Sequence, residues 1–244
     1  LISWRQPYLF DGMVKPSNQK WMVVDHNNPI GTHVPTVFQL PFIDKMIFLN
    51  NWHRDQYIAV GVPAEKCWVG GTAIDTSLYE QDVERERHRV IAHYHPKRGL
   101  DVLYRMWPTV RLAVPDATLH AFWWQPELFL SPNPELGIFP MEHLGPAEIA
   151  LELLASDVFS YPATGTETAP LTVIEAQCAG AIPVVVPVGG MLGVLDYGRL
   201  ASHANFANIL INTLREEEHP RPTAEIREKY SWKAVAARWA KELF

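Results

Sequence analysis

The segment Tyr161-Pro-Ala-Thr-Gly-Thr-Glu-Thr-Ala-Pro-Leu-Thr-Val-Ile-Glu-Ala-Gln-Cys-Ala-Gly180 decides the fold class of this 244-residue chain. It continues Asp157–Tyr161, a run typical of a strand, and its Gly/Thr-rich part indicates a loop. Pro170–Ala179 then has a helical composition, and Gly180 is a residue type that ends helices. The run Ile182–Val186 is typical of a strand buried on both faces. Strand, loop, helix and strand in this order predict a βαβ unit of a parallel sheet.

The same alternation extends back to about residue 88. The predicted elements are the strands Val90–Tyr94 and Thr118–Trp123 and the helices Leu100–Trp107 and Pro146–Ala155. We therefore expect an α/β fold in which residues 76–230 form a Rossmann-like domain with a parallel sheet. Within this range, residues 214–225 are charged and contain prolines, so we expect them to form an exposed connector.

The first 75 residues are less regular. The predicted elements here are the strands Trp21–Asp25, Met46–Leu49 and Lys66–Val69, and a helix over Trp52–Ala59 with Asn51 as its N-cap. Two or three strands make a thin sheet, so we interpret residues 1–75 as a partial N-terminal α/β portion. Residues 231–244 predict a C-terminal amphipathic helix, because Val235, Trp239 and Leu243 recur every four residues.

Composition excludes several classes of protein. Hydrophobic residues make up 48% and charged residues 20%, as in globular proteins. A net charge of -6 without a Lys/Arg-rich run argues against a nucleic-acid partner, and no apolar run approaches the roughly 20 residues of a transmembrane segment. Cys67 and Cys178 lie in apolar stretches, so we expect buried free thiols in a cytoplasmic protein. The ten His residues show no metal-ligand spacing, so no metal site or cofactor is expected.

The loop after Tyr161 is the first candidate for a ligand site. It follows a strand of a parallel sheet, and α/β proteins bind ligands at that edge. The predicted helix begins near Thr168–Pro170, so backbone N–H groups of its first turn are free to bind phosphate. These are the N–H groups of Ala169, Leu171 and Thr172.

Two glutamates flank this anion site. Glu167 lies just before it, and Glu175 lies about two turns into the helix, roughly 10 Å further along. Carboxylates accept paired hydrogen bonds from vicinal hydroxyls, so the arrangement favours a nucleotide sugar, with one carboxylate on the sugar and the other on the ribose. The alternative is that Glu167 is a solvated loop residue and Glu175 a surface residue of the helix.

Glu167 and Glu175 form a Glu-x7-Glu motif, and the chain continues as Glu175-Ala-Gln-Cys-Ala-Gly-Ala-Ile-Pro-Val-Val185. In this segment the chain resembles the retaining glycosyltransferases of family 4, which have the GT-B fold. The resemblance implies that Glu167 contacts hydroxyls of the donor sugar and that Glu175 contacts the ribose. It also implies transfer of a sugar from a nucleoside-diphosphate donor to an acceptor hydroxyl, with retention of the anomeric configuration.

A second segment extends the resemblance. The family pattern is matched by His95-Pro-Lys-Arg-Gly-Leu-Asp-Val-Leu103, by Trp107-Pro108 and by Val114-Pro-Asp-Ala-Thr-Leu-His120. This similarity implies that Arg98 contacts the donor diphosphate, with Lys97 beside it. A planar guanidinium suits phosphate because it donates two parallel hydrogen bonds. The alternative is a solvated turn that carries two charges.

Three further segments are candidates for the donor site. His143-Leu-Gly-Pro-Ala-Glu-Ile149 is similar to the segment that cradles the nucleotide base in the family, through backbone groups around Leu144. His26, in Asp25-His-Asn-Asn-Pro29, lies where relatives have a loop that faces the donor; the alternative is an incidental loop histidine. The pair Trp123-Trp124 either lines the donor pocket or packs in the interior.

The resemblance covers nearly the whole chain, but a full GT-B protein has two Rossmann-like domains. Roughly the first half of the N-terminal domain, which contributes most acceptor contacts in the family, has no counterpart here. This half was lost naturally, was cut away, or is supplied by another chain, and the sequence leaves these alternatives open. The expected partners are accordingly a second copy in a homodimer, favoured by apolar surface that the short N-terminal half exposes, or a partner chain that supplies this half. The donor base, the donor sugar and the acceptor stay open.

The leading hypothesis is a retaining glycosyltransferase that needs no metal. The short N-terminal portion supports a second hypothesis, a non-catalytic nucleotide-sugar-binding or assembly subunit, which predicts donor binding without turnover. A GT-B sugar-nucleotide epimerase is a third hypothesis, but it needs catalytic groups in the N-terminal portion. A dinucleotide dehydrogenase is disfavoured because no G-x-G-x-x-G follows a strand.

Overall fold

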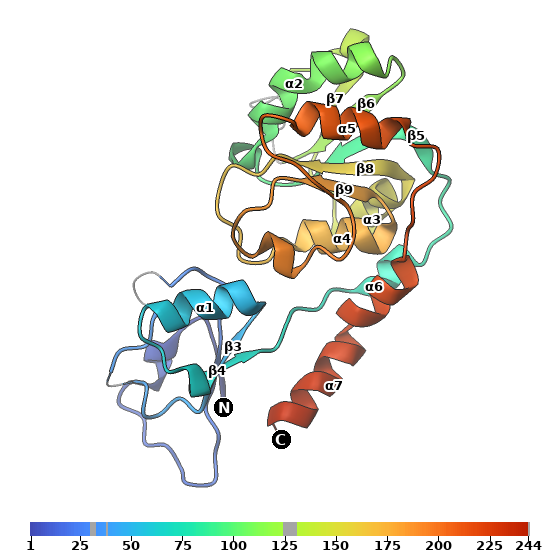
Figure 1. Ribbon diagram of the computed structural model, residues 1–244. Helices are drawn as coiled ribbons and strands as arrows, with labels where there is room; N and C mark the ends of the chain where they lie inside the picture. The colour runs from blue at the N-terminus through green and yellow to red at the C-terminus, as the bar shows by residue number, and fades with distance from the viewer. Residues whose placement is uncertain (30–32, 38, 124–130, 244) are drawn as a thin grey trace.

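The computed structural model describes residues 1–29, 33–37, 39–123 and 131–243. The chain forms a smaller N-terminal unit and a larger C-terminal domain, each built around a parallel sheet (Figure 1). The prediction of an α/β fold with a parallel C-terminal sheet is confirmed.

The N-terminal unit has a four-stranded parallel sheet in the order β1-β2-β3-β4. Its elements are β1 (Ile2–Trp4), β2 (Met22–Val24), β3 (Lys45–Phe48), β4 (Cys67–Val69) and the helix α1 (Asn51–Ala59). The sequence predicts β2, β3, β4 and α1. It gives no signal for β1, because three residues are too few to show a period.

The start of α1 differs from the prediction by one residue. Asn50, and not Asn51, is the N-cap: its backbone is extended, and its side chain accepts a hydrogen bond of 2.9 Å from the N–H of His53. Asn51 is the first residue of the helix and is exposed. Two adjacent asparagines have the same capping chemistry, so backbone geometry alone distinguishes them.

The C-terminal domain has a six-stranded parallel sheet in the order β10-β9-β8-β5-β6-β7. Its strands are β5 (Glu86–Ala92), β6 (Thr118–Phe122), β7 (Ile138–Met141), β8 (Ser156–Tyr161), β9 (Ile182–Val185) and β10 (Arg199–Leu200). Helices α2 (Leu100–Ala113) and α5 (Phe206–Arg215) cover one face, and α3 (Pro146–Ala155) and α4 (Leu171–Ala179) cover the other (Figure 1). Because both faces are covered, the central strand β8 is buried along its whole length.

Helix α3 has the predicted bounds, whereas other predicted boundaries in this domain are wrong. The strand predicted over Val90–Tyr94 is β5, which begins four residues earlier and ends at Ala92. Helix α2 continues through Pro108 to Ala113, because the buried Val110 lies on the same face as Trp107 and holds the last turn against the core. The predicted connector 214–225 overlaps two helices. Leu214 is buried in α5, and α6 (Thr223–Tyr230) begins inside that range.

Helix α7 (Trp232–Leu243) links the two units, because it runs from the C-terminal domain back to the N-terminal sheet (Figure 1). Leu243 packs into a buried cluster with residues of β2 and β3. The indole N–H of Trp239 donates a hydrogen bond of 3.0 Å to the carbonyl of Gly70. A side chain on Gly70 would overlap Trp239 and Ile47, so only glycine fits at this contact. The predicted amphipathic C-terminal helix is therefore present, and Trp239 and Leu243 on its apolar face contact the N-terminal unit.

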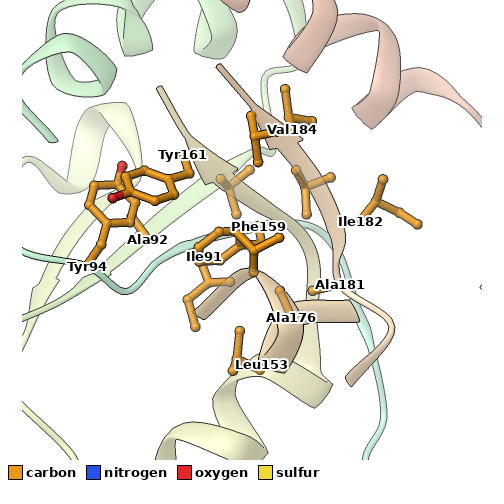
Figure 2. Packing of buried hydrophobic residues seen from close by; sticks show 14 of the residues in the cluster. Ile91, Ala92, Tyr94, Leu153, Phe159, Tyr161, Ala176, Ala181, Ile182 and Val184 are labelled. Atoms are coloured by element: carbon orange, nitrogen blue, oxygen red, sulfur yellow. The ribbon is translucent and has the colours of Figure 1, made fainter. Parts of the chain in front are cut away.

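The core of the C-terminal domain lies between its sheet and its helices. In Figure 2, residues of the central strands pack against residues of α3 and α4. The labelled strand residues are Ile91, Ala92, Phe159, Tyr161, Ile182 and Val184, and the helix residues are Leu153 and Ala176. This packing fixes the strand ends from which the candidate site is built.

Both cysteines are free thiols. Cys178 is buried as predicted, whereas Cys67 is only half-buried because it lies on the edge strand β4. Burial raises the pKa of the Cys67 thiol to about 11 and that of Cys178 to about 12. Across the described part of the chain, no helix is long and apolar enough to cross a membrane.

Candidate functional site

A cavity of about 500 Å³ lies between the two units. From the N-terminal side it is lined by Arg5, His26, Leu49 and Thr72. From the C-terminal domain it is lined by residues that follow β5, β6 and β8: His93, Tyr94, His95, Arg98, Trp123, Tyr161 and residues 167–172. The cavity therefore lies at the edge of the parallel sheet where α/β proteins bind ligands.

The cavity brings together most of the predicted site residues. It is lined by His26, Arg98, Glu167, Thr168, Leu171 and Thr172, whereas Lys97, Leu144 and Glu175 are not among its lining residues. A second cavity, of about 470 Å³ and beside the start of α1, shares Leu49 and Thr72 with the first but contains none of the predicted residues. We therefore take the first cavity as the candidate site.

Glu167 and Arg98 form an ion pair in the wall of this cavity. The guanidinium Nη1 of Arg98 donates a hydrogen bond of 2.6 Å to Oε1 of Glu167, and the hydroxyl of Tyr161 donates to the same oxygen. The Glu167 side chain is only 8% exposed, whereas that of Arg98 is 53% exposed. The carboxylate is thus held in place, and the guanidinium remains accessible to a ligand.

The loop that carries Arg98 packs tightly against the loop that leads to Glu167. Gly99 has a φ of 127°, and a side chain there would overlap the carbonyl of Pro162. The N–H of Thr164 donates to the carbonyl of Arg98 at 3.2 Å. Glycine is therefore required after Arg98 to bring the two loops, and with them the ion pair, together.

The start of α4 forms the floor of the predicted anion site. The helix begins at Leu171, one residue after the predicted start, and Pro170 at its N-cap position provides no side-chain cap. Leu171 and Thr172 both line the cavity. The first-turn N–H groups carry a partial positive charge from the helix dipole. Together with Arg5 and Arg98, they make this side of the cavity attractive to an anion.

Contacts that the sequence does not predict join the two units at the same loop. The hydroxyl of Thr168 donates to the carbonyl of His26 at 2.9 Å, and the side-chain amide of Asn50 donates to the carbonyl of Thr168 at 2.6 Å. The N–H of Gly190 donates to the carbonyl of Glu167 at 2.7 Å. A side chain on Gly190 would overlap the carbonyl of Thr168. The pair Gly189-Gly190 after β9 is the sequence signal that could have indicated this close approach.

His26 lines the cavity on the N-terminal side, and its ring lies 4.4 Å from that of Trp4. Burial, with help from the nearby Arg5 and His53, lowers the pKa of His26 to about 4. The imidazole is therefore neutral at physiological pH and can donate or accept a hydrogen bond. His53 holds the His26 loop by donating from Nε2 to the carbonyl of Asn27 at 2.6 Å.

An aromatic wall extends the cavity beyond Arg98. It consists of His93, Tyr94, His95 and Trp123, and the rings of His95 and Trp123 lie 4.9 Å apart. Trp123 therefore lines the pocket, which was one of the two possibilities for it; Trp124 lies outside the described residues. Burial lowers the pKa of His93 to about 4, so this ring is neutral as well.

Three predicted residues do not line the cavity. Glu175 is on α4, one turn beyond Leu171 and Thr172, so it continues the helix face that lines the cavity. Burial raises the pKa of Glu175 to about 7. Leu144 precedes α3 and packs against the core of the C-terminal domain, while Lys97 is exposed. Within the described ranges, no three His, Cys, Asp or Glu side chains are grouped as metal ligands would be.

No protein-family model matches the chain, and no curated protein matches it in sequence. Solved structures do match it in three dimensions. HepE from Anabaena, in complex with UDP and glucose, has a TM-score of 0.70 and 16% identity over 92% of this chain and 71% of its own. The pneumococcal O-GlcNAc transferase GtfA, in complex with UDP and GlcNAc, has a TM-score of 0.67 and 15% identity over 91% of this chain and 51% of its own. Sucrose-phosphate synthase from Thermosynechococcus elongatus has a TM-score of 0.63 and 14% identity over 92% of this chain and 67% of its own.

At such low identity the similarity shows the fold. The chain has the GT-B type of α/β fold, with a Rossmann-like C-terminal domain and a smaller N-terminal unit, as the sequence predicts. The candidate site lies in the cleft between the two parts of this fold.

Proposed function

We propose that the protein is a glycosyltransferase that takes a sugar from a nucleoside-diphosphate donor and transfers it to an acceptor hydroxyl. The observation that carries the proposal is the Arg98–Glu167 pair, which lies beside the uncapped start of α4 in a cleft of a GT-B fold. The solved structures with UDP sugars or their parts make UDP the first nucleotide to test.

Each part of the cleft suits one part of such a donor. The first-turn N–H groups of α4 and the guanidinium of Arg98 suit the diphosphate, because both donate to phosphate oxygens. Glu167 suits the hydroxyls of the sugar, and Glu175, one turn further along the helix, suits the ribose. We assign the nucleobase to backbone groups around Leu144. Lys97 and Thr168 are assigned to the phosphate end of the donor.

The proposed chemistry relies on charge stabilisation. Breaking the bond between the sugar and the diphosphate leaves positive charge on the sugar and negative charge on the leaving group. Arg98 and the helix start stabilise the leaving group in a preorganised way, and this role needs no metal ion. The neutral His26 faces the sugar end of the cavity, where it can donate a hydrogen bond. We further propose retention at the anomeric carbon, which proton NMR of the first-formed product tests.

A calorimetric screen of UDP, GDP, ADP and TDP sugars tests donor binding and identifies the base. We expect saturable binding of one donor by the wild type and weaker binding by Glu175→Ala. Product formation in the presence of a chelator then tests metal independence. Binding without transfer to any acceptor would favour the alternative of a non-catalytic nucleotide-sugar-binding or assembly subunit. No binding by the wild type would contradict both.

We also propose that the protein works in the cytoplasm as a homodimer joined through its N-terminal unit. The two free thiols suit a reducing compartment. Strand β1 is an edge of the N-terminal sheet, and the side chains of Ile2 and Trp4 on it are about half exposed. Light scattering of the purified chain tests the association, and a monomer at all concentrations would contradict it.

A further inference from the structure

Tyr161 is a buried residue of the candidate site that contacts Glu167. It is the last residue of β8, it is 1% exposed, and its hydroxyl donates to Oε1 of Glu167. Arg98 donates to the same oxygen. Among the described residues, no group donates a hydrogen bond to the other oxygen, Oε2. The carboxylate is therefore anchored through one oxygen and keeps the other for a ligand.

The two anchors of Glu167 differ in mobility. Arg98 lies on an exposed turn after β5, and more than half of its side chain is exposed. It lines the same cavity as the start of α4, where its guanidinium can contact a diphosphate. A guanidinium that turns toward phosphate oxygens gives up part or all of its contact with Glu167. The carboxylate then depends on its second anchor.

Tyr161 cannot move in the same way. Its ring stacks on that of Tyr94, with the ring centres 4.1 Å apart and the planes at 22°, and the edge of Phe159 lies against it (Figure 2). Tyr94 and Phe159 are themselves buried. Burial, with the hydrogen bond to Glu167, raises the pKa of the Tyr161 hydroxyl. The hydroxyl therefore keeps its proton and stays a donor at physiological pH.

We propose that Tyr161 is a positioning residue: it holds Glu167 with its free oxygen toward the donor sugar while Arg98 is engaged by the donor diphosphate. The inference rests on the proposed function, because it assumes that Glu167 contacts the sugar. Tyr161 acts through Glu167. It should therefore matter for the sugar part of the donor and not for its nucleotide part.

Tyr161→Phe tests this inference, because it removes one hydroxyl and keeps the aromatic stack. The probes are UDP-glucose and UDP, measured by calorimetry, together with kcat and KM for turnover of the same donor. We expect the affinity for UDP-glucose to fall roughly tenfold, as for loss of a hydrogen bond to a charged group, and kcat to fall with it. The affinity for UDP should stay within about twofold of the wild type.

Tyr197→Phe is the matched control. Tyr197 donates a hydrogen bond of 2.7 Å to the carbonyl of Gln177, away from the cavity, so its variant loses a comparable bond without touching the site. A general loss of stability would affect both variants alike. In a Glu167→Gln background, Tyr161→Phe should add almost nothing, because the residue through which it acts is already altered.

The outcomes separate the two proposals. If the wild type binds or turns over UDP-glucose but Tyr161→Phe is unchanged, this inference is wrong and the proposed function stands. The inference is also wrong if Tyr161→Phe loses UDP and UDP-glucose equally, or if its effect persists in full without Glu167. If the wild type binds neither UDP-glucose nor any other nucleotide sugar, the proposed function fails and takes this inference with it.

Discussion

The two parts of the molecule contribute to the same cavity but differ in how they are built. The C-terminal domain has a six-stranded sheet with helices on both faces, and its central strand β8 is buried throughout. The N-terminal unit has four strands of three or four residues each, and two of the three residues of its edge strand β1 are about half exposed. The larger, more deeply buried domain therefore carries Arg98 and Glu167, while the smaller unit presents His26 across the cleft.

The smaller unit is positioned largely by its contacts with the larger one. Asn50 and the His26 carbonyl both bond to Thr168, and Leu243 of α7 packs against β2 and β3. The N-terminal sheet itself contributes little stability, because its strands are short. Under the proposed function, the C-terminal domain supplies most of the binding groups, and the junction aligns them with His26.

The largest effect is expected for the cation of the C-terminal domain. Arg98→Ala should lower kcat for sugar transfer roughly 100- to 1000-fold, as seen when one preorganised charge-stabilising group is removed from an active site. Steady-state kinetics with the donor identified by the binding screen provide the measurement. Arg105→Ala is the control, since Arg105 is an exposed arginine of α2 paired with Asp101. Equal activity of the two variants would exclude Arg98 from catalysis.

The next effect concerns the junction itself. Gly190→Ala places a methyl group against the carbonyl of Thr168 and the side-chain amide of Asn50, which joins the two units, so we expect a loss of about 2 to 3 kcal/mol of unfolding free energy from overpacking. If the N-terminal unit depends on this contact, calorimetry should show its unfolding separating from that of the C-terminal domain. Gly165→Ala is the matched control, because nothing lies near a side chain at Gly165. A single unchanged transition in both variants would contradict the dependence.

The same division decides what could be predicted from the sequence. The elements of the C-terminal domain follow local rules: a Val/Ile run, a helix with Pro near its start, and Gly180 in the left-handed conformation at its end. Such signals fix a helix such as α3 to the residue. The Glu-x7-Glu motif also led directly to Glu167, because it is a local pattern at the end of a strand.

The junction could not be predicted in this way. Asn50 and Thr168 are 118 residues apart in the chain, and His26 and Thr168 are 142 apart. Contacts between such distant residues depend on how two packed units meet, and no local period encodes that. The contact between Tyr161 and Glu167 was missed for a related reason. The sequence shows Tyr161 only as the end of a buried strand. Its link to the candidate site is visible only in the hydrogen bond between its hydroxyl and Glu167.

A smaller effect is expected for Asn50, whose side chain donates hydrogen bonds from the N-terminal unit to the C-terminal domain. Asn50→Ala removes the cap of α1 and the bonds to the carbonyls of Thr168 and Gly190. We expect a loss of about 2 kcal/mol in the free energy of unfolding, measured with urea. Asn51→Ala should cost less than about 0.5 kcal/mol, because Asn51 is exposed and caps nothing. Equal losses for the two neighbours would show that the junction contacts do not stabilise the fold.

The smallest effect concerns Glu175, on the helix that leads away from the cavity. Burial raises its pKa from 4.5 to about 7, so the folded state holds a proton that the unfolded state releases above pH 4.5. Stability contributed by this group is therefore lost as pH rises from about 4.5 past 7. Because the side chain is partly exposed, the effect should be about 1.5 kcal/mol at pH 8. Glu175→Gln, which cannot ionise, should be more stable than the wild type at pH 8 and about equal to it at pH 5.

The pH dependence of donor affinity provides a second test of the Glu175 carboxyl. If the ionised Glu175 accepts hydrogen bonds from the ribose, the affinity for a nucleotide sugar should rise as pH increases from 6 to 8, and Glu175→Gln should abolish that rise. His26 and His93, with pKa values near 4, do not titrate in this range. If Glu175→Gln changes stability but not donor affinity, Glu175 is a buried carboxyl of α4 that does not contact the donor. The binding groups of the C-terminal domain would then be confined to the residues that line the cavity.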